Sequence, residues 1–307
     1  MMIKRCTSFG LELAAIAKEN RDVVFVDTDM YLACGAEPMV KAVPDQVYNV
    51  GIAEQNAFNV AAGLALCGKT AVVVSFAVFA STRAADQVRN TIAYNNLNVK
   101  IVGTHAGLET GEDGGTHQAL EDISIMRTFP YMKIFVPSTP LQAKKLTRIM
   151  LETFGPFYFR LTKNPVEEIY EDIQEFRLGG SVRFGDGKDA SILACGNMLE
   201  IALQAQEQLK SDGINVRVYD MYSIKPIDEE AILSAAKETK GIVCVEDHSI
   251  LGGLGGTVAE ITASKYPTKV LRVGVNDKYG RSGDTESLRE MYGLTPENVV
   301  TAVKALQ

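Results

Sequence analysis

The sequence has 307 residues, of which 46% are hydrophobic and 22% charged, and its formal net charge is −7 with a pI near 5.2. This length suits two domains, and the composition is that of an ordinary globular protein. The acidic balance argues against nucleic acid or an anionic membrane surface as a partner, and no apolar run has the length of a membrane span.

Short apolar runs alternate with helical patterns along the first half of the chain. The predicted strands are residues 22–29, 70–76, 99–105, 133–138 and 156–161. The predicted helices between them are residues 8–19, 85–95 and 139–154. This alternation predicts an α/β fold with a mainly parallel sheet that is covered on both faces.

A charged, irregular segment at residues 164–180 separates this unit from a second one of the same kind. The second unit is predicted to contain strands at 190–196, 215–221 and 241–247 and a helix at 199–213. We therefore expect two consecutive α/β domains, covering residues 1–175 and 186–307, with the boundary near residues 170–188.

The cysteines and the N-terminus indicate the compartment. The five cysteines are scattered without C-x-x-C spacing, so we interpret them as small buried hydrophobes in a reducing environment, not as a disulfide or zinc framework. The N-terminal run M-M-I-K-R-C-T-S-F-G lacks the apolar core of a signal peptide. We expect a cytoplasmic protein.

Polar and aromatic residues follow several of the predicted strands. They are Asp27, Asp29, Ser75, Phe76, His105 and Arg160. In open α/β sheets, ligands bind beyond the carboxyl ends of the strands. These residues all belong to the first unit, so the functional site is expected there.

Glu54 stands in the run V-G-I-A-E-Q-N-A-F, directly before an alanine- and glycine-rich stretch that predicts a buried helix. A carboxylate in that position needs a partner, because burial of an unpaired charge is costly. Taken alone, it is also typical of a helix-start residue that interacts with the positive end of the helix dipole.

A second run, G-E-D-G-G-T-H-Q at residues 111–118, combines flexible glycines with an acceptor and an imidazole. Asp113 and His117 on one short loop suit sugar hydroxyls and proton transfer, although a solvated turn has a similar composition. His105 lies a few residues earlier. The two histidines lack close metal-ligand spacing, so we predict no metal site on this chain.

Two glycine-rich runs imitate known phosphate motifs. Gly185-Asp186-Gly187, followed by Asn215, looks like the G-D-G…N metal–diphosphate motif, but its surroundings read as strand, turn, strand. The run S-I-L-G-G-L-G-G-T-V-A-E at residues 249–260 opens a helix with glycines, but it lacks a dinucleotide fingerprint. We interpret the first as a turn and the second as packing.

Together the motifs resemble the C-terminal half of transketolase, in the form in which that enzyme is split into two polypeptides. The resemblance covers essentially the whole chain: a pyrimidine-binding domain is followed by the family's C-terminal domain. G-I-A-E-Q-N is similar to the segment that carries the family's catalytic glutamate. F-A-V-F-A-S-T-R and T-H-A-G-L-E-T-G-E-D-G-G-T-H-Q are similar to its aromatic and substrate-loop segments.

The resemblance implies roles at the cofactor. Glu54 would hydrogen-bond the aminopyrimidine ring of thiamine diphosphate and promote loss of the thiazolium proton. Phe76 and Phe79 would form the ring pocket, with Phe79 as the stacking partner. Asp29 would lie near the thiazolium side, and Thr82 would stand where the family often has a third aromatic residue.

The resemblance also implies roles at the substrate. Asp113 and His117 would contact donor hydroxyls, with His117 assisting proton movement, and His105 would contact an acceptor phosphate. Arg160, in F-R-L-T-K-N-P, would bind phosphate, and so would Arg5 in K-R-C-T-S-F-G. Residues 30–35 read M-Y-L-A-C-G where full-length transketolases carry a phosphate-binding serine.

The implied reaction is transfer of a two-carbon ketol unit from a ketose donor to an aldose acceptor, with sugars or sugar phosphates as substrates. Because the diphosphate and Mg²⁺ have no ligands here, a partner chain bearing G-D-G…N is expected to supply them. The expected assembly is an α2β2 tetramer in which this chain also pairs with itself.

Three other functions remain open on the sequence. The beta chain of 2-oxo acid dehydrogenases has a similar glutamate segment but lacks the G-E-D-G-x-T-H-Q loop. Deoxyxylulose phosphate synthase has a similar loop but is normally one longer chain. A non-catalytic transketolase-like subunit has little reason to keep a buried carboxyl and a polar loop.

Overall fold

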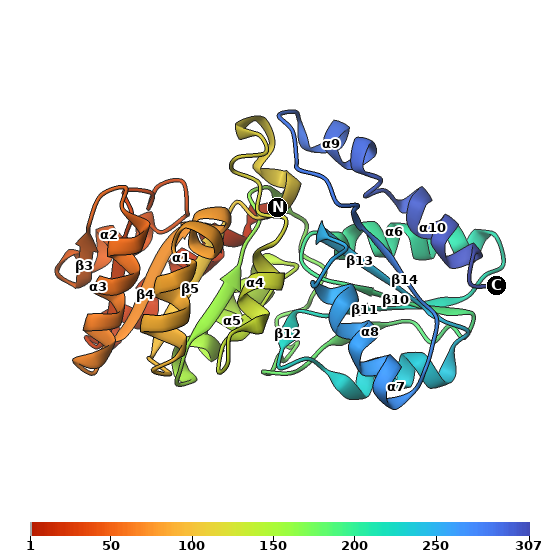
Figure 1. Ribbon diagram of the computed structural model, residues 1–307, viewed down its shortest axis with the longest axis horizontal. Coiled ribbons are helices and arrows are strands. Elements are labelled where there is room, and N and C mark those ends of the chain that lie inside the picture. Colours follow the sequence, from red (N-terminus) through yellow and green to blue (C-terminus); the bar gives the residue numbers. More distant parts are fainter. Residues whose placement is uncertain (1) are drawn as a thin grey trace.

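The first sheet has seven strands in the computed structural model, which describes residues 2–307 (Figure 1). Its order is β12-β6-β7-β5-β4-β2-β3, and all pairs except β12–β6 are parallel. The strands are β2 (Val23–Asp27), β3 (Val47–Asn49), β4 (Thr70–Phe76), β5 (Val99–Thr104), β6 (Lys133–Phe135), β7 (Phe157–Arg160) and β12 (Ser223–Lys225). The predicted parallel sheet is confirmed.

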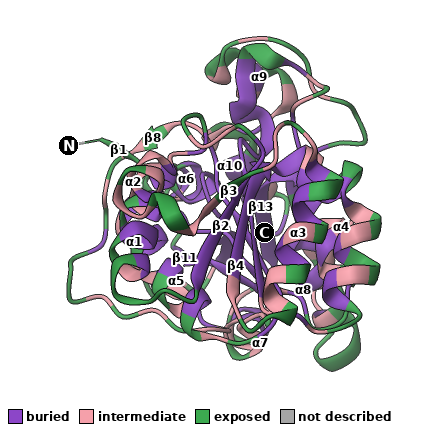
Figure 2. Cartoon of the chain, turned by 90° about the vertical axis from the view of Figure 1, so that its left-hand side faces the viewer, coloured by how far each residue is buried: buried purple, intermediate pink, exposed green. Residues whose placement is uncertain are grey.

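Helices cover both faces of this sheet, which accounts for its continuous apolar strands (Figure 2). They are α1 (Arg5–Glu19), α2 (Glu37–Ala42), α3 (Glu54–Leu66), α4 (Asp122–Thr128) and α5 (Pro140–Glu152). Helices α1, α2 and α5 pack on one face, and α3 and α4 lie on the other. Short 3₁₀ segments occur at η1 (Pro44–Gln46) and η4 (Gly107–Asp113), and η2 (Phe79–Arg83) and η3 (Gln87–Ala93) are π-helical.

The second unit has a five-stranded sheet of order β14-β13-β10-β11-β9, parallel except at the β9 edge. Its strands are β9 (Val182–Phe184), β10 (Ala190–Ala194), β11 (Val216–Asp220), β13 (Ile242–Ser249) and β14 (Val270–Val275). Its helices are α6 (Met198–Ser211), α7 (Glu229–Glu238), α8 (Leu254–Lys265), α9 (Thr285–Tyr292) and α10 (Pro296–Lys304). A two-stranded ladder joins β1 (Ile3–Lys4) to β8 (Pro165–Val166).

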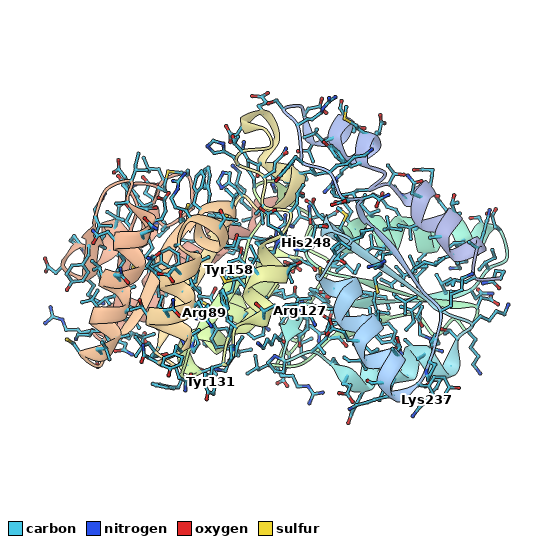
Figure 3. All side chains as sticks on the ribbon, viewed as in Figure 1. Arg89, Arg127, Tyr131, Tyr158, Lys237 and His248 are labelled. Carbon is cyan, nitrogen blue, oxygen red and sulfur yellow. The ribbon has the colours of Figure 1, made fainter. Side chains whose placement is uncertain are left out.

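The two units are joined by a shared sheet and a shared core. Strand β12 belongs to the second half of the chain, yet it extends the first sheet at β6, a pairing that the sequence did not predict. One apolar cluster runs from the β4 and β5 strands to residues of β10, β11 and β13. Tyr158 and His248 lie near this junction in Figure 3. The domain boundary near residues 170–188 stays a prediction. Because β12 lies after that boundary and pairs with the first sheet, the two domains are not separated cleanly in sequence.

The structure explains both of the glycine-rich runs that look like phosphate motifs, residues 185–187 and 249–260. Residues 185–187 form the turn between β9 and β10, which confirms the strand–turn–strand prediction. The N-terminus of α8 is occupied by the chain's own Glu246, whose carboxylate accepts hydrogen bonds from the backbone N–H groups of Leu254 and Gly255 at 2.7 and 2.8 Å. That capping leaves these N–H groups already satisfied, so the glycine run is not an open anion site.

The topology marks one place in the first sheet for a ligand. From β2 the chain moves outward to β3 and then returns to β4 on the other side of β2, so the direction of winding reverses there. Ligands of open α/β sheets bind at such a reversal, beyond the carboxyl ends of the strands. Glu54 begins α3 on the path from β3 back to β4, and Phe76 ends β4. No helix among residues 2–307 is long and apolar enough to cross a membrane.

Candidate active site

Glu54 is the first residue of α3 and is 4% exposed. Its side chain stands at the positive end of the helix dipole. One carboxylate oxygen, Oε2, accepts a hydrogen bond from Nη1 of Arg83 at 3.1 Å, and half of the Arg83 side chain is exposed. The carboxylate is therefore buried, but its partner reaches the solvent.

An aromatic wall lies next to this ion pair. The rings of Phe76 and Phe79 are nearly parallel, with centroids 6.0 Å apart and 13° between planes. The His105 ring stacks on Phe76 at 4.1 Å, and the His117 ring meets the edge of Phe79 at 5.3 Å. The guanidinium carbon of Arg83 lies 4.3 Å from the Phe79 centroid. The structure thus brings both phenylalanines, both histidines and, through Arg83, Glu54 into one cluster.

His105 follows β5 in a left-handed conformation with φ of 56°, which is uncommon for a residue other than glycine. Its ring is buried, with Nδ1 3.1 Å from the Thr104 hydroxyl. Burial, aided by the charge of Lys163, lowers the pKa of His105 to about 4. At neutral pH the ring is therefore uncharged, with one nitrogen able to donate and the other to accept.

The loop at residues 107–118 makes hydrogen bonds to the second unit, and it lies next to α9 in Figure 1. The carboxylate of Asp247 accepts from the Leu108 N–H at 2.9 Å, and Gln118 Nε2 donates to the Arg281 carbonyl at 2.9 Å. Gly107 has φ of 73°, and a Cβ there would collide with the Asp247 carboxylate. The glycine is required by this close contact. Asp113 is exposed on the loop.

Of the remaining cofactor residues that the sequence predicts, Asp29 follows β2 and Thr82 lies in η2. Asp29 is exposed, with φ of 63°, and its carboxylate accepts from Asn49 Nδ2 at 3.0 Å. Thr82 is exposed, and its hydroxyl donates to the Val78 carbonyl at 2.5 Å. In the segment at residues 30–35, Cys34 is buried with Sγ 3.0 Å from the Thr104 hydroxyl. That segment therefore packs a thiol inward.

Arg160 does not face the cluster, which corrects its expected role as a phosphate ligand. Its side chain is 1% exposed, and Nε donates to Asp122 Oδ2 at 2.7 Å. Nη2 donates to the backbone carbonyls of Ala119 and Asp247. A guanidinium that is held by these groups at the junction of the two units is structural.

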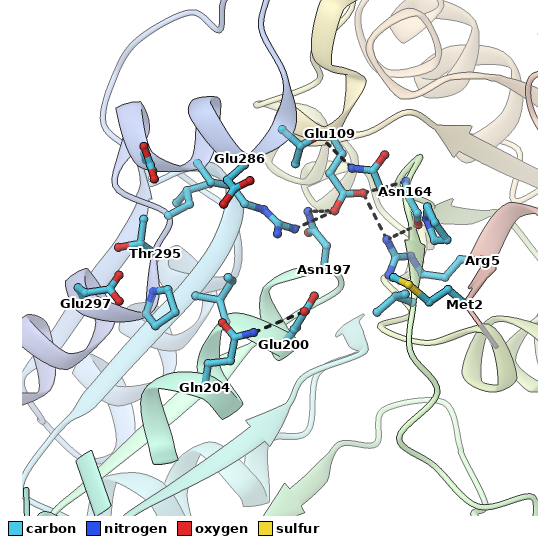
Figure 4. A pocket seen from close by; sticks show the side chains of 18 of the residues that line it. Met2, Arg5, Glu109, Asn164, Asn197, Glu200, Gln204, Glu286, Thr295 and Glu297 are labelled. Atoms are coloured by element: carbon cyan, nitrogen blue, oxygen red, sulfur yellow. Dashed lines mark hydrogen bonds and ion pairs between the residues drawn. The ribbon is translucent and has the colours of Figure 1, made fainter. Parts of the chain in front are cut away.

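Arg5 is likewise buried, which corrects the second expected phosphate ligand. It donates to the Ser138 carbonyl at 3.0 Å and to the Thr162 hydroxyl, and it pairs with Glu109 at 3.4 Å. Glu109 also accepts from Arg289 Nη2 at 2.9 Å. This network forms one wall of a cavity of about 600 Å³ at the junction of the units (Figure 4). The cavity is separate from the aromatic cluster.

Two cations at the cluster were missed by the sequence analysis. Lys163 comes three residues after Arg160, is half-buried, and acts electrostatically on His105. Arg83 comes four residues after Phe79, within the run F-A-V-F-A-S-T-R. The motif contained the signal for Arg83, since residues four apart on a helical turn share a face. Among residues 2–307 no group of three or more His, Cys, Asp or Glu side chains is arranged to hold a metal ion.

Two protein-family models together match most of the chain. Residues 2–168 match the transketolase pyrimidine-binding domain, and residues 180–299 match the transketolase C-terminal domain. The chain belongs to the transketolase family. The match includes Glu54, the aromatic wall and the loop at residues 107–118 in the first of these domains.

Several relatives of this transketolase-family chain have nearly its full length. A putative transketolase C-terminal section of Methanocaldococcus jannaschii is 43% identical over 298 residues, covering 96% of this chain and 93% of that protein. A 6-deoxy-6-sulfo-D-fructose transketolase subunit of a Clostridium species is 39% identical, covering 97% and 92%. One of the subunits of an apulose-4-phosphate transketolase of Phocaeicola vulgatus is 40% identical, covering 97% and 96%.

A solved structure of a split-gene transketolase, described as an inactive β4 tetramer, shares the fold with a TM-score of 0.91. It is 40% identical and covers 100% of this chain and 98% of that one. Transketolases use thiamine diphosphate, and the cluster fits the pyrimidine end of that cofactor. Its Phe79 ring is already stacked by a planar group, and the same group donates to Glu54.

Proposed function

We propose that this chain is the pyrimidine-binding subunit of a two-chain transketolase, which transfers a two-carbon ketol unit from a ketose donor to an aldose acceptor. The carrying observation is the juxtaposition of a buried carboxylate at the start of α3 with the Phe79 face and two histidines. One side of this cluster suits a flat heteroaromatic ring, and the other suits a polar substrate.

At the cofactor, each residue has a defined task. Glu54 hydrogen-bonds the pyrimidine ring and, as a carboxylate in a poorly solvated position, favours the ring's protonated form. Phe79 stacks on the ring and Phe76 supports Phe79 from behind. Thr82 lies at the rim, and Asp29 faces the thiazolium side. Thiamine diphosphate itself supplies the carbanion chemistry when bound.

At the substrate, the histidines and the loop act together. His117 moves a proton at a donor hydroxyl, and Asp113 accepts a hydrogen bond from a second hydroxyl. His105 is neutral, so it contacts the sugar as a hydrogen-bonding group, not as a charge. Lys163 takes the anion-binding role that Arg160 and Arg5, both buried, cannot fill.

The names of two relatives indicate which kind of charged group the substrate carries. One relative is named for a sulfonated sugar and another for a sugar phosphate, at similar identity to this chain. Both substrates carry an anion, which Lys163 beside His105 can attract. We infer an anionic sugar as substrate, and the residues that distinguish sulfonate from phosphate are expected partly on the partner chain.

The diphosphate and Mg²⁺ are expected to bind to a partner chain with the G-D-G…N motif, since this chain has that string only in a turn. The relative whose structure is a β4 tetramer is described as inactive in that form. We therefore propose an α2β2 assembly, with this chain as the β subunit and its self-association at the centre.

The test is reconstitution with the partner chain, followed by measurement of thiamine diphosphate binding and ketol transfer. Glu54→Gln is expected to lower turnover by roughly 10²- to 10⁴-fold. Glu152→Gln changes an exposed glutamate at the end of α5 and serves as the matched control. A reconstituted complex that binds no thiamine diphosphate, or a Glu54→Gln enzyme of full activity, contradicts the proposal.

A further inference from the structure

Arg83 makes two contacts at once in the free subunit. Its guanidinium lies 4.3 Å from the Phe79 centroid, and its Nη1 donates to Glu54 Oε2 at 3.1 Å. A guanidinium is planar, delocalised and rich in donors, so it both stacks on aromatic faces and pairs with carboxylates. The two contacts hold the guanidinium between an aromatic ring and a buried acid.

These are the two contacts that the proposed function gives to the aminopyrimidine of the cofactor. That heterocycle is also planar, and it too must stack on Phe79 and donate to Glu54. The guanidinium and the pyrimidine cannot occupy the same ring face and the same carboxylate oxygen together. One must therefore leave before the other binds.

The ion pair between Arg83 and Glu54 stabilises the free subunit. Within residues 2–307, Arg83 provides the hydrogen-bond donor to the Glu54 carboxylate, which is 4% exposed. A buried carboxylate without a donor would be costly. Arg83 is also able to leave, because half of its side chain is exposed and it stands at the end of the π-helical turn η2. Such turns are frequent at functional sites.

We propose that Arg83 is a placeholder for the cofactor: it holds the aromatic face and the Glu54 carboxylate in the empty subunit and is displaced by the aminopyrimidine ring. This inference rests on the proposed function. It makes Arg83 a residue that sets cofactor affinity, because binding is weakened by the fraction of subunits in which the guanidinium covers the site.

The first test is cofactor affinity in the reconstituted complex, measured by titration calorimetry with thiamine diphosphate. Arg83→Met keeps an unbranched apolar stem and removes the guanidinium, and Arg83→Ala repeats the test with a shorter side chain. Both are expected to lower the Kd by about five- to tenfold, the factor for a site that is covered about four fifths to nine tenths of the time. Unchanged or weaker binding would overturn the proposal.

Arg89→Met is the matched control. Arg89 (labelled in Figure 3) lies six residues further along, is exposed, and donates to Asn90 Oδ1 at 2.5 Å. The Arg89→Met change removes the same charge from an exposed side chain that contacts neither Glu54 nor Phe79. Its Kd is expected to equal that of the unmodified complex, and a Kd lowered as far as that of Arg83→Met would mean that net charge, not the placeholder, is responsible.

The second test does not use the cofactor. In the isolated subunit, Glu54→Gln, Arg83→Met and the double variant form a cycle whose stabilities are measured by urea unfolding. The placeholder requires a favourable coupling between the two residues in the free subunit and its loss when the complex is saturated with thiamine diphosphate. Additive effects in the free subunit would overturn it.

The two proposals fail in different ways. If the unmodified complex binds no thiamine diphosphate, the proposed function and the placeholder both fall. If the complex binds the cofactor and turns over, but Arg83→Met binds it no more tightly, then the placeholder alone is wrong.

Discussion

Glu54 and Glu109 are two buried glutamates of nearly equal exposure, 4% and 3%, in very different surroundings. Glu109 lies between the two units and accepts from Arg5, Arg289, the Asn164 backbone and Asn197. Within the described part of the chain, residues 2–307, Glu54 has one ion-pair partner, and that partner is half exposed.

The difference teaches how to separate a structural from a functional carboxylate. Burial alone would raise the pKa of Glu109, but the two guanidinium groups hold it below its usual range. A carboxylate with all its acceptor positions filled by rigid groups is committed to the fold. A carboxylate whose single partner is half exposed can exchange that partner for another hydrogen-bond donor. The proposed role of Glu54 at the cofactor requires such an exchange.

The largest expected effect is that of Arg160→Met. This change leaves Asp122 buried at the junction without its 2.7 Å partner, so the free energy of unfolding should fall by about 3–5 kcal/mol. Urea unfolding measures the loss. A KM that rises without any loss of stability would show that Arg160 binds substrate. It would then contradict the structural role of the buried arginines.

A smaller loss is expected for Glu109→Gln, because glutamine keeps one acceptor for the two arginines. We expect the free energy of unfolding to fall by about 2–3 kcal/mol. The matched change at the other carboxylate, Glu54→Gln, should lower it by less than about 1 kcal/mol. Equal losses at the two positions would mean that Glu54 is as structural as Glu109.

Lys163→Met separates the anion site from the buried arginines. With the charge removed, the KM for an anionic sugar should rise about tenfold while the unfolding midpoint stays unchanged. The comparison is made with the uncharged sugar of the same skeleton, for which the KM should not change. A rise for both sugars would place the role of Lys163 elsewhere.

A further effect concerns the pH dependence of stability. His105 has a folded-state pKa of about 4 against an ordinary value of 6.5, because burial disfavours its charged form. Between these two pH values the unfolded chain binds more protons, so stability falls as the pH falls from 6.5 to 4. His105→Asn should make that fall shallower in urea unfolding measured across the range. Parallel profiles for the two proteins would show that His105 is not buried in this way.

Much of the molecule could be predicted from the sequence, because its signals are local. The apolar run V-V-F-V-D became β2, within the strand predicted at residues 22–29. Glycines at 107, 111 and 114 gave a loop whose left-handed turns need them. The motifs around Glu54, Phe79 and His117 are local in the same way, since short-range spacing sets which of their residues share a turn or a loop.

What the sequence could not determine is which charges meet across the fold. Arg160 and Lys163 are three residues apart in one strand-end motif, and only tertiary packing decides that Arg160 is enclosed by the Asp122 carboxylate of the first unit and the Asp247 backbone carbonyl of the second. The pairing of β12 with β6 and the contact of Arg83 with Glu54 also join residues that are far apart in the sequence. By itself the sequence determined the α/β fold and the family, and it predicted the residues of the cofactor face. The tertiary structure decided which polar groups are consumed by the fold and which stay open, because a charge is neutralised by its neighbours in space.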